Sequence, residues 1–327
     1  MRGDPRRSPL KLPRFRLSTR PQNPRFVAPA KPALERATSP AWRTTTDDAD
    51  RDYDEAMCSP VAPVEPKPAA SVVLVRAASA GSREPIEVYM IRRRRSMKFL
   101  GGYYAFPGGK VDPEDGSPAA VARCRGLASV DPETIFPGHD TAPALAFWVA
   151  AVRELLEESG ILLACDAHGH PIDARNPAVA ARIERCRRAL MVAEAPFAEL
   201  VAREGWYCDL SGLRYLSHFI TPRSSPIRFS ARFFLCRAPG DQAPRLFTEE
   251  TSEGFWIHPG HGYHRFLADE MKMAEPAEYG LAWLAQFGSL EDLWTAHADG
   301  RHKFHGIIDR IDAFWERFDW KANRFPA

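Results

Sequence analysis

Ala150-Ala-Val-Arg-Glu-Leu-Leu-Glu-Glu-Ser-Gly-Ile161 combines an apolar helical pattern with three carboxylates and one arginine. At roughly 100° per residue, Glu157 and Glu158 fall on either side of Glu154, on one face of a helix. The opposite half gathers the apolar side chains, which are Leu145, Trp148, Val149, Val152, Leu155 and Leu156. The stretch therefore predicts a helix with one core face and one acidic face.

The residues alone leave two interpretations of the acidic face open. Like charges at i,i+4 cost an isolated helix roughly a few tenths of a kcal/mol per pair, and no lysine is interleaved here. Three carboxylates without cysteine or histidine among them favour a hard cation, Mg²⁺ or Mn²⁺, over zinc. The simpler interpretation is a solvated acidic helix face.

Two segments resemble the halves of the Nudix box. Arg153-Glu-Leu-Leu-Glu-Glu-Ser-Gly-Ile161 is similar to its second half, and Phe106-Pro-Gly-Gly-Lys-Val-Asp-Pro-Glu-Asp115 to its glycine-rich beginning. The 37 residues between Asp115 and Arg153 split the box by an insertion, and Asp115 replaces the glutamate usual in the family. The resemblance implies an α/β fold and hydrolysis of nucleoside diphosphates linked to another group.

The resemblance also implies roles for individual residues. Mg²⁺ or Mn²⁺ would be held by the Gly109 carbonyl, Glu154, Glu157 and Glu158, where the metal sits against a diphosphate. Arg153 would orient these acids through an ion pair rather than touch the substrate. One more carboxylate would come from the loop before Trp256, as metal ligand or as base. Glu250 is the first candidate, and Glu253 and Glu249 follow.

A split box after Phe-Pro-Gly-Gly resembles the branch of Nudix proteins related to peroxisomal coenzyme A diphosphatases. Phe219-Ile-Thr-Pro222, the segment 228–234 and the segment 275–289 are similar to further motifs of that branch. The coenzyme A signature before the box is partial, with Lys98 in place of an arginine and Arg94 in place of a serine. The predicted substrate-binding residues are Arg93, Arg95, Lys98 and Phe106.

The predicted function is therefore divalent-metal-dependent cleavage of a diphosphate linkage, with coenzyme A or acyl-coenzyme A favoured as substrate. ADP-ribose or a dinucleotide is the alternative substrate. A non-catalytic Nudix-like binding or regulatory module is the alternative from another class. The partner expected is a small molecule, with neither a membrane nor nucleic acid, and the inserted helices could form a homodimer contact.

Composition separates a tail from the rest of the chain. Residues 1–43 carry nine more basic than acidic side chains, whereas the whole chain has a net charge of +2. The Pro- and Arg-rich segment 1–68 is predicted to be disordered. No apolar run approaches the roughly 20 residues that span a bilayer. Six scattered cysteines without a C-x-x-C pair favour free thiols and a cytoplasmic location.

The remaining pattern predicts an α/β/α sandwich with a mixed sheet across residues 69–327. Strands are expected at 71–75, 86–91, 161–165, 228–236 and 256–258. Helical insertions are expected at 116–145 and 166–215, with Asn176 as a helix cap, and C-terminal helices at 275–320, the last over 304–318. The glycines and proline of residues 258–264 predict a flexible loop.

Overall fold

The computed structural model describes residues 64–127, 143–221, 225–246 and 251–298 of the chain. All of them belong to one compact unit, residues 57–327. The strands are β1 (Lys67–Ala77), β2 (Ile86–Arg93), β3 (Tyr104–Ala105), β4 (Gly108–Lys110), β5 (Cys124–Arg125), β6 (Ala164–Cys165), β7 (Tyr207–Asp209), β8 (Arg214–Ile220), β9 (Phe229–Arg237) and β10 (Thr251–Ile257). The helices are η1 (Pro113–Gly116), α1 (Pro118–Ala122), α3 (Ala144–Ser159), α4 (Pro177–Met191), α5 (Phe197–Arg203), α6 (Pro259–Leu267), α7 (Glu275–Leu284) and α8 (Leu290–Ala298).

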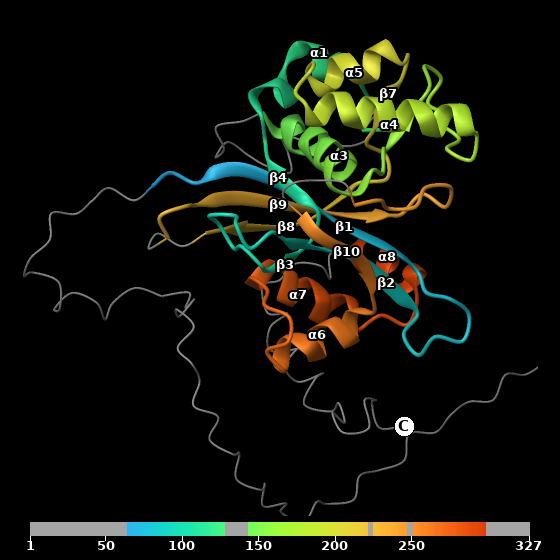
Figure 1. Cartoon of the computed structure of the whole chain (residues 1–327). Coiled ribbons are helices and arrows are strands. Elements are labelled where there is room, and N and C mark those ends of the chain that lie inside the picture. Colours follow the sequence, from blue (N-terminus) through green and yellow to red (C-terminus); the bar gives the residue numbers. More distant parts are fainter. Residues whose placement is uncertain (1–63, 128–142, 222–224, 247–250, 299–327) are drawn as a thin grey trace, which may run out of the picture. The chain divides into compact units, whose positions relative to one another are not determined.

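A mixed sheet with helices on both faces forms the centre of this unit. Its strand order is β10-β2-β1-β9-β8, with β3 added to β2 and β4 added to β1. Strands β1 and β9 run parallel, and the other pairs are antiparallel. Helices α3, α4 and α5 cover one face, and α6 and α7 cover the other (Figure 1). The predicted α/β/α sandwich with a mixed sheet is therefore confirmed.

Alternate residues of β1 contact the two helical layers. Val72 and Leu74 belong to the apolar core beneath α3, whereas Val73 and Val75 belong to the core beneath α6 and α7. None of the four is more than 1% exposed. Because successive side chains of a strand point to opposite faces, a strand covered on both sides needs such an unbroken apolar run.

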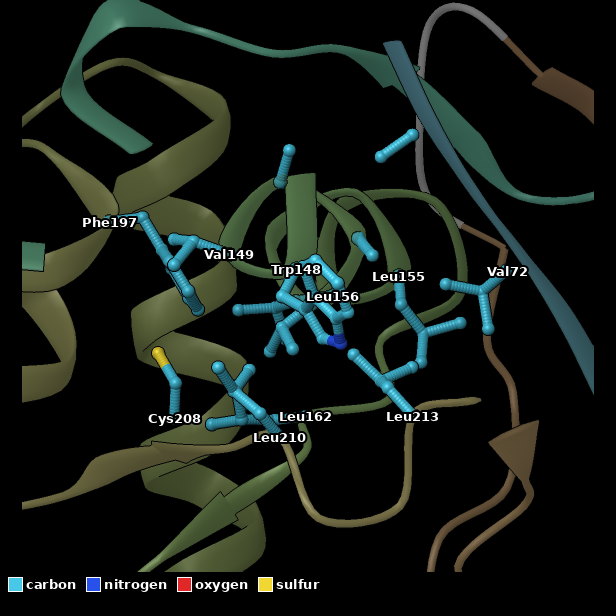
Figure 2. Close-up of a cluster of buried hydrophobic side chains, with 14 of the residues drawn as sticks. Val72, Trp148, Val149, Leu155, Leu156, Leu162, Phe197, Cys208, Leu210 and Leu213 are labelled. Atoms are coloured by element: carbon cyan, nitrogen blue, oxygen red, sulfur yellow. The ribbon is translucent and has the colours of Figure 1, made fainter. Parts of the chain in front are cut away.

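Helix α3 is buried on nearly every side. Figure 2 shows its apolar side chains, Trp148 among them, between Val72 of β1 and Phe197 of α5. The acidic half is covered as well, since Glu154 is 9% and Glu158 is 5% exposed. The interpretation of a solvated acidic face is therefore wrong, because segments distant in the sequence cover that face.

The predicted second insertion, 166–215, contains strands as well as helices. Helix α4 begins as expected, with the Asn176 side chain accepting a hydrogen bond from the Ala178 amide at 2.9 Å. Strand β7 follows α5 and lies in a small sheet of order β5-β7-β6, and β8 begins at Arg214. Of the strand predicted at 161–165, only Ala164–Cys165 is extended, and it pairs with β7 rather than with the main sheet.

Residues 258–264, predicted as a flexible loop, instead begin helix α6. Pro259 occupies the first helical position, where its missing N–H has no consequence. The Glu84 carboxylate accepts a hydrogen bond from the Gly260 amide at 2.7 Å and so satisfies a free donor of the first turn. A Cβ at Gly262 would lie 3.0 Å from a side chain of α7, so this glycine permits close helix packing.

Two predicted segments extend beyond the described residues. The first insertion, 116–145, contains α1 and β5, and its residues 128–142 lie outside the described part. The C-terminal segment 275–320 contains α7 and α8, and the helix predicted over 304–318 also lies outside it. None of the described helices has the length and apolarity needed to cross a membrane.

The close pairing of β4 with β1 generates a stability prediction. Gly108 has φ +155°, and a Cβ there would lie 2.3 Å from the Ala70 carbonyl oxygen. We expect Gly108→Ala to lower the free energy of unfolding by about 3 kcal/mol in urea denaturation, because backbone atoms must move. Gly212→Ala is the matched control, since no atom lies within 4 Å of its Cβ position. Equal effects of the two substitutions would contradict this packing.

Candidate active site

The glycine turn and the acidic helix meet directly, although an insertion separates them in sequence. Strand β4 places Gly109 opposite Ala70 of β1, beneath α3. A Cβ at Gly109 would lie 2.4 Å from a carboxylate oxygen of Glu154, so only glycine fits without displacing that acid. The Gly108 amide donates a hydrogen bond to Glu158 at 2.7 Å. The two halves of the split motif therefore form one site.

Arg153 lies at the centre of the acids and ties them together. Its Nε and Nη2 donate to the two carboxylate oxygens of Asp115 at 3.0 and 2.9 Å. Its Nη1 donates to Glu154 at 2.9 Å and to Glu157 at 3.1 Å. Its Nη2 also donates to the Lys110 carbonyl at 2.6 Å. With 7% of its side chain exposed, Arg153 is held by these contacts and so orients the acids.

Asp115 is a member of the site that the sequence did not identify. It lies in η1 and is 2% exposed. One carboxylate oxygen accepts both from Arg153 and from the Asp112 amide, the latter at 2.9 Å. Its position as the first acid of the split motif was the available signal. The structure gives it the role of holding Arg153 in place.

Acidic side chains outnumber the single guanidinium at the centre of the cluster. Arg153 forms ion pairs with Asp112, Asp115, Glu154 and Glu157, while Glu158 accepts a hydrogen bond from the Gly108 amide. Burial raises the pKa of Glu154 to about 8, and Arg153 only partly opposes this effect. Burial likewise raises the pKa values of Glu157 and Asp115.

A divalent cation fits the chemistry of this cluster. Carboxylates and a backbone carbonyl are the oxygen ligands that Mg²⁺ and Mn²⁺ prefer, and a cation would offset the excess buried charge. Within the described ranges, no three His, Cys, Asp or Glu side chains already stand in a metal-binding arrangement. The acids would therefore have to turn toward a shared ion, and Glu157, with 27% of its side chain exposed, has the most freedom to do so.

Arg187 of α4 is a second residue that sequence reasoning missed. It is 1% exposed, and its Nη2 and Nε donate to the Glu157 carbonyl at 2.8 and 3.1 Å. These bonds satisfy a carbonyl in the last turn of α3. Arg187 lies on the buried face of α4 with Ile183 and Cys186. An arginine at apolar helical spacing was the signal that could have revealed it.

The predicted phosphate-binding residues lie on the connection from β2 to β3. Arg95 and Lys98 are exposed, whereas Arg93 is partly buried and donates through Nε to the Phe99 carbonyl at 3.3 Å. The Phe99 ring packs edge-on against Phe229 of β9, with ring centres 5.0 Å apart. The sheet thus anchors this connection while two of its cations remain accessible to an anion.

Phe106, predicted to contact the substrate, belongs to the core. It is 3% exposed, and a Cβ at Gly280 of α7 would lie 2.7 Å from its ring. A side chain enclosed in this way fixes the glycine turn against α7 and presents no surface to a ligand. We therefore reassign Phe106 as an anchor of the loop.

The additional carboxylate expected before Trp256 is only partly described. Glu250, the first candidate for the catalytic base, and Glu249 lie outside the described residues. Glu253 pairs with Arg92, whose Nη1 lies 2.7 Å from its carboxylate, and 48% of its side chain is exposed. This ion pair makes Glu253 the weaker candidate for a base.

Known proteins match both the sequence and the fold. The family model described as "NUDT19 Nudix domain" matches residues 66–284. The acyl-coenzyme A diphosphatase NUDT19 of Gallus gallus is 30% identical over 275 residues, which cover 70% of this chain and 71% of that protein. The acyl-coenzyme A diphosphatase NUDT19 of Homo sapiens is 28% identical over 264 residues, which cover 69% of this chain and 70% of that protein. A crystal structure of a NUDIX hydrolase from Alicyclobacillus acidocaldarius aligns with a TM-score of 0.57 and 29% identity, covering 69% of this chain and 94% of that one.

The central position of Arg153 generates a first prediction. We expect Arg153→Met to lower the free energy of unfolding by about 3–5 kcal/mol, because the buried Asp115 and Glu154 and the partly buried Glu157 lose their ion-pair partner. Arg175→Met is the matched control, since the Arg175–Asp173 pair is exposed and its loss should leave the free energy of unfolding nearly unchanged. Urea denaturation at neutral pH measures both. A small loss for Arg153→Met would show that the acids do not depend on the guanidinium.

The raised pKa of Glu154 generates a second prediction. The folded protein holds this proton with a pKa of about 8, against 4.5 as the ordinary value. The protonated Glu154 therefore stabilises the folded state fully below pH 4.5, and this stabilisation is lost as pH rises toward the folded-state pKa of about 8. In EDTA, the melting temperature should therefore fall between about pH 4.5 and about pH 8 and level off above that. Glu154→Gln should flatten this dependence, and parallel curves for the two proteins would contradict the prediction.

Proposed function

Because the chain belongs to the NUDT19 Nudix domain family of hydrolases, we propose that it is a metal-dependent diphosphatase acting on coenzyme A or acyl-coenzyme A. The observation that carries the proposal is the contact of the glycine turn with the acidic helix. Gly109 abuts the Glu154 carboxylate, and Gly108 donates to Glu158. Both halves of the split motif are thereby available to one cation and one diphosphate.

We assign the cation to Glu154, Glu157, Glu158 and the Gly109 carbonyl, with Mg²⁺ or Mn²⁺ as the ion. When bound, such an ion supplies positive charge that neutralises the diphosphate and favours ionisation of the attacking water. Arg153 orients the acids and favours their ionised form, since its guanidinium contacts Glu154 and Glu157. The gathering of several carboxylates around the single Arg153 guanidinium supports this assignment.

The reaction is displacement at phosphorus by water. Water attacks one phosphorus, the bond from that phosphorus to the bridging oxygen breaks, and two phosphate monoesters leave. The water proton passes to a carboxylate, for which Glu250 remains the first candidate and Glu157 the most exposed of the box acids. On the substrate side, the accessible Arg95 and Lys98 are suited to hold further phosphate groups of the ligand.

The substrate class is taken from the relatives and tested by a hydrolysis screen. The proteins of Gallus gallus and Homo sapiens named above are acyl-coenzyme A diphosphatases, and this chain shares about 30% identity with them. The screen compares coenzyme A, acyl-coenzyme A, ADP-ribose and NADH with Mg²⁺, with Mn²⁺ and with EDTA. We expect metal-dependent turnover of the first two. Preference for ADP-ribose or NADH would reassign the substrate. A cytoplasmic location and a homodimer stay predictions from the sequence.

The ligand assignment predicts the effect of two substitutions. Glu157→Gln and Glu158→Gln should each lower kcat/KM by at least about 100-fold, because each removes a negatively charged ligand. The melting temperature should stay nearly unchanged, since glutamine keeps the shape of the side chain. Glu199→Gln on the exposed face of α5 is the control and should keep full activity. Full turnover in both active-site variants would refute the assignment.

A further inference from the structure

A hollow of about 480 Å³ lies next to the acidic cluster. It is formed by residues of η1, α3 and the connection from α4 to α5. Arg153 and Glu157 line it, and neither Gly109 nor Glu154 contributes to its wall. Its volume is within the range of about 300–1,000 Å³ that small-molecule sites occupy. The hollow is therefore an extension of the candidate active site.

The walls of the hollow change from polar to apolar. Asp112, Glu114, Asp115 and Glu157 line one part, where the diphosphate would lie close by. The other part is mainly apolar and is lined by Val149, Leu190, Ala193, Ala195, Pro196, Phe197 and Ala198. Glu194 also lines it and forms an ion pair with Arg203 at 2.7 Å. Phe197 and Ala198 are 3% and 6% exposed, so packing holds this wall in place. An apolar wall next to a reacting polar centre suits a ligand with a long, uncharged arm.

The charge of the lining residues decides which end of the substrate enters the hollow. Asp112, Glu114, Asp115 and Glu157 all line the hollow. A nucleotide end with an additional phosphate would be repelled by these carboxylates. It would instead be attracted to the β2–β3 connection, where Arg95 and Lys98 are exposed. An arm made of amides, a thioester and an alkyl chain has no charge to be repelled.

We propose that this hollow binds the acyl-phosphopantetheine arm of the substrate, with the nucleotide end directed to the β2–β3 connection. The proposal rests on the proposed function for the identity of the substrate, and it adds a site and an orientation. The inserted residues then have a task in recognition, because α5 and its preceding turn supply most of the apolar wall.

The two product halves test the proposal without any need for turnover. Octanoyl-4′-phosphopantetheine and adenosine 3′,5′-bisphosphate are titrated separately into the full chain with Mg²⁺ by isothermal titration calorimetry. Ala195→Trp narrows the hollow and should raise the Kd of the acylated arm by at least about 10-fold. The Kd of the bisphosphate should change by less than about twofold. Arg95→Ala combined with Lys98→Ala should give the opposite pattern.

Val192→Trp is the matched control for added bulk. Val192 is 75% exposed and lies in the same turn, and it does not line the hollow. It should leave both Kd values unchanged. A thermal melt verifies that Ala195→Trp folds. If it does not fold, the wild-type chain is titrated with acyl groups of increasing length, and the Kd should fall by up to about fourfold for each methylene buried.

Each outcome decides the proposal. The proposal is supported if Ala195→Trp weakens binding of the acylated arm and leaves binding of the bisphosphate unchanged. Tighter binding of longer acyl groups supports it as well. Equal weakening of both halves, no weakening, or no binding of the arm to the wild-type chain overturns it. Failure of the proposed function is seen separately, as absence of hydrolysis of coenzyme A and acyl-coenzyme A in the screen. If the chain binds the arm but does not hydrolyse coenzyme A or acyl-coenzyme A, the proposed binding site in the hollow stands and the proposed hydrolase function is rejected.

Discussion

The site depends on a single buried cation, the guanidinium of Arg153. Burial opposes its charge, but Glu154 and Asp115 raise its pKa, so it remains protonated. The same guanidinium is the main group that lowers the pKa values of Glu154 and Glu157 against the effect of burial. Without it, the pKa values of these carboxyl groups would lie higher still, which would make the groups poorer ligands for a hard ion. Arg153 thus favours the ionised form of the acids that it orients.

Most of the sandwich could be predicted because its signals are local. The apolar run of β1 and the cap at Asn176 are visible within a few residues, and the two half-motifs mark the site on α3. Helix α6 was missed because its support comes from Glu84, far away in sequence. The burial of Glu154 was missed for the same reason, since its cover comes from distant segments. Local patterns predict an element and do not predict what covers it.

The same limit explains which residues of the site could be predicted from the sequence and which could not. The acids of α3 were identified from their spacing, whereas Asp115 and Arg187 act through contacts across 38 and 30 residues. Phe106 was assigned to the substrate because of its place beside the glycines, and only packing against α7 shows that it is a core residue. Glu250 lies outside the described residues, so its role stays a prediction. Side-chain identity indicated the chemistry, and tertiary packing decided which residues can take part in it.

The insertion is compatible with the site because both halves of the motif are positioned by the same strand. The first half is fixed by β4, which pairs with β1 from Ala69 to Ser71, and Asp115 follows in η1. The second half is fixed by α3, which packs on Val72 and Leu74 of that strand. Neither placement uses the length of chain between the halves. An insertion at this point can therefore lengthen the chain without moving the acids. The apolar wall of the hollow comes mostly from α5 and the turn before it, which follow the second half of the motif in sequence.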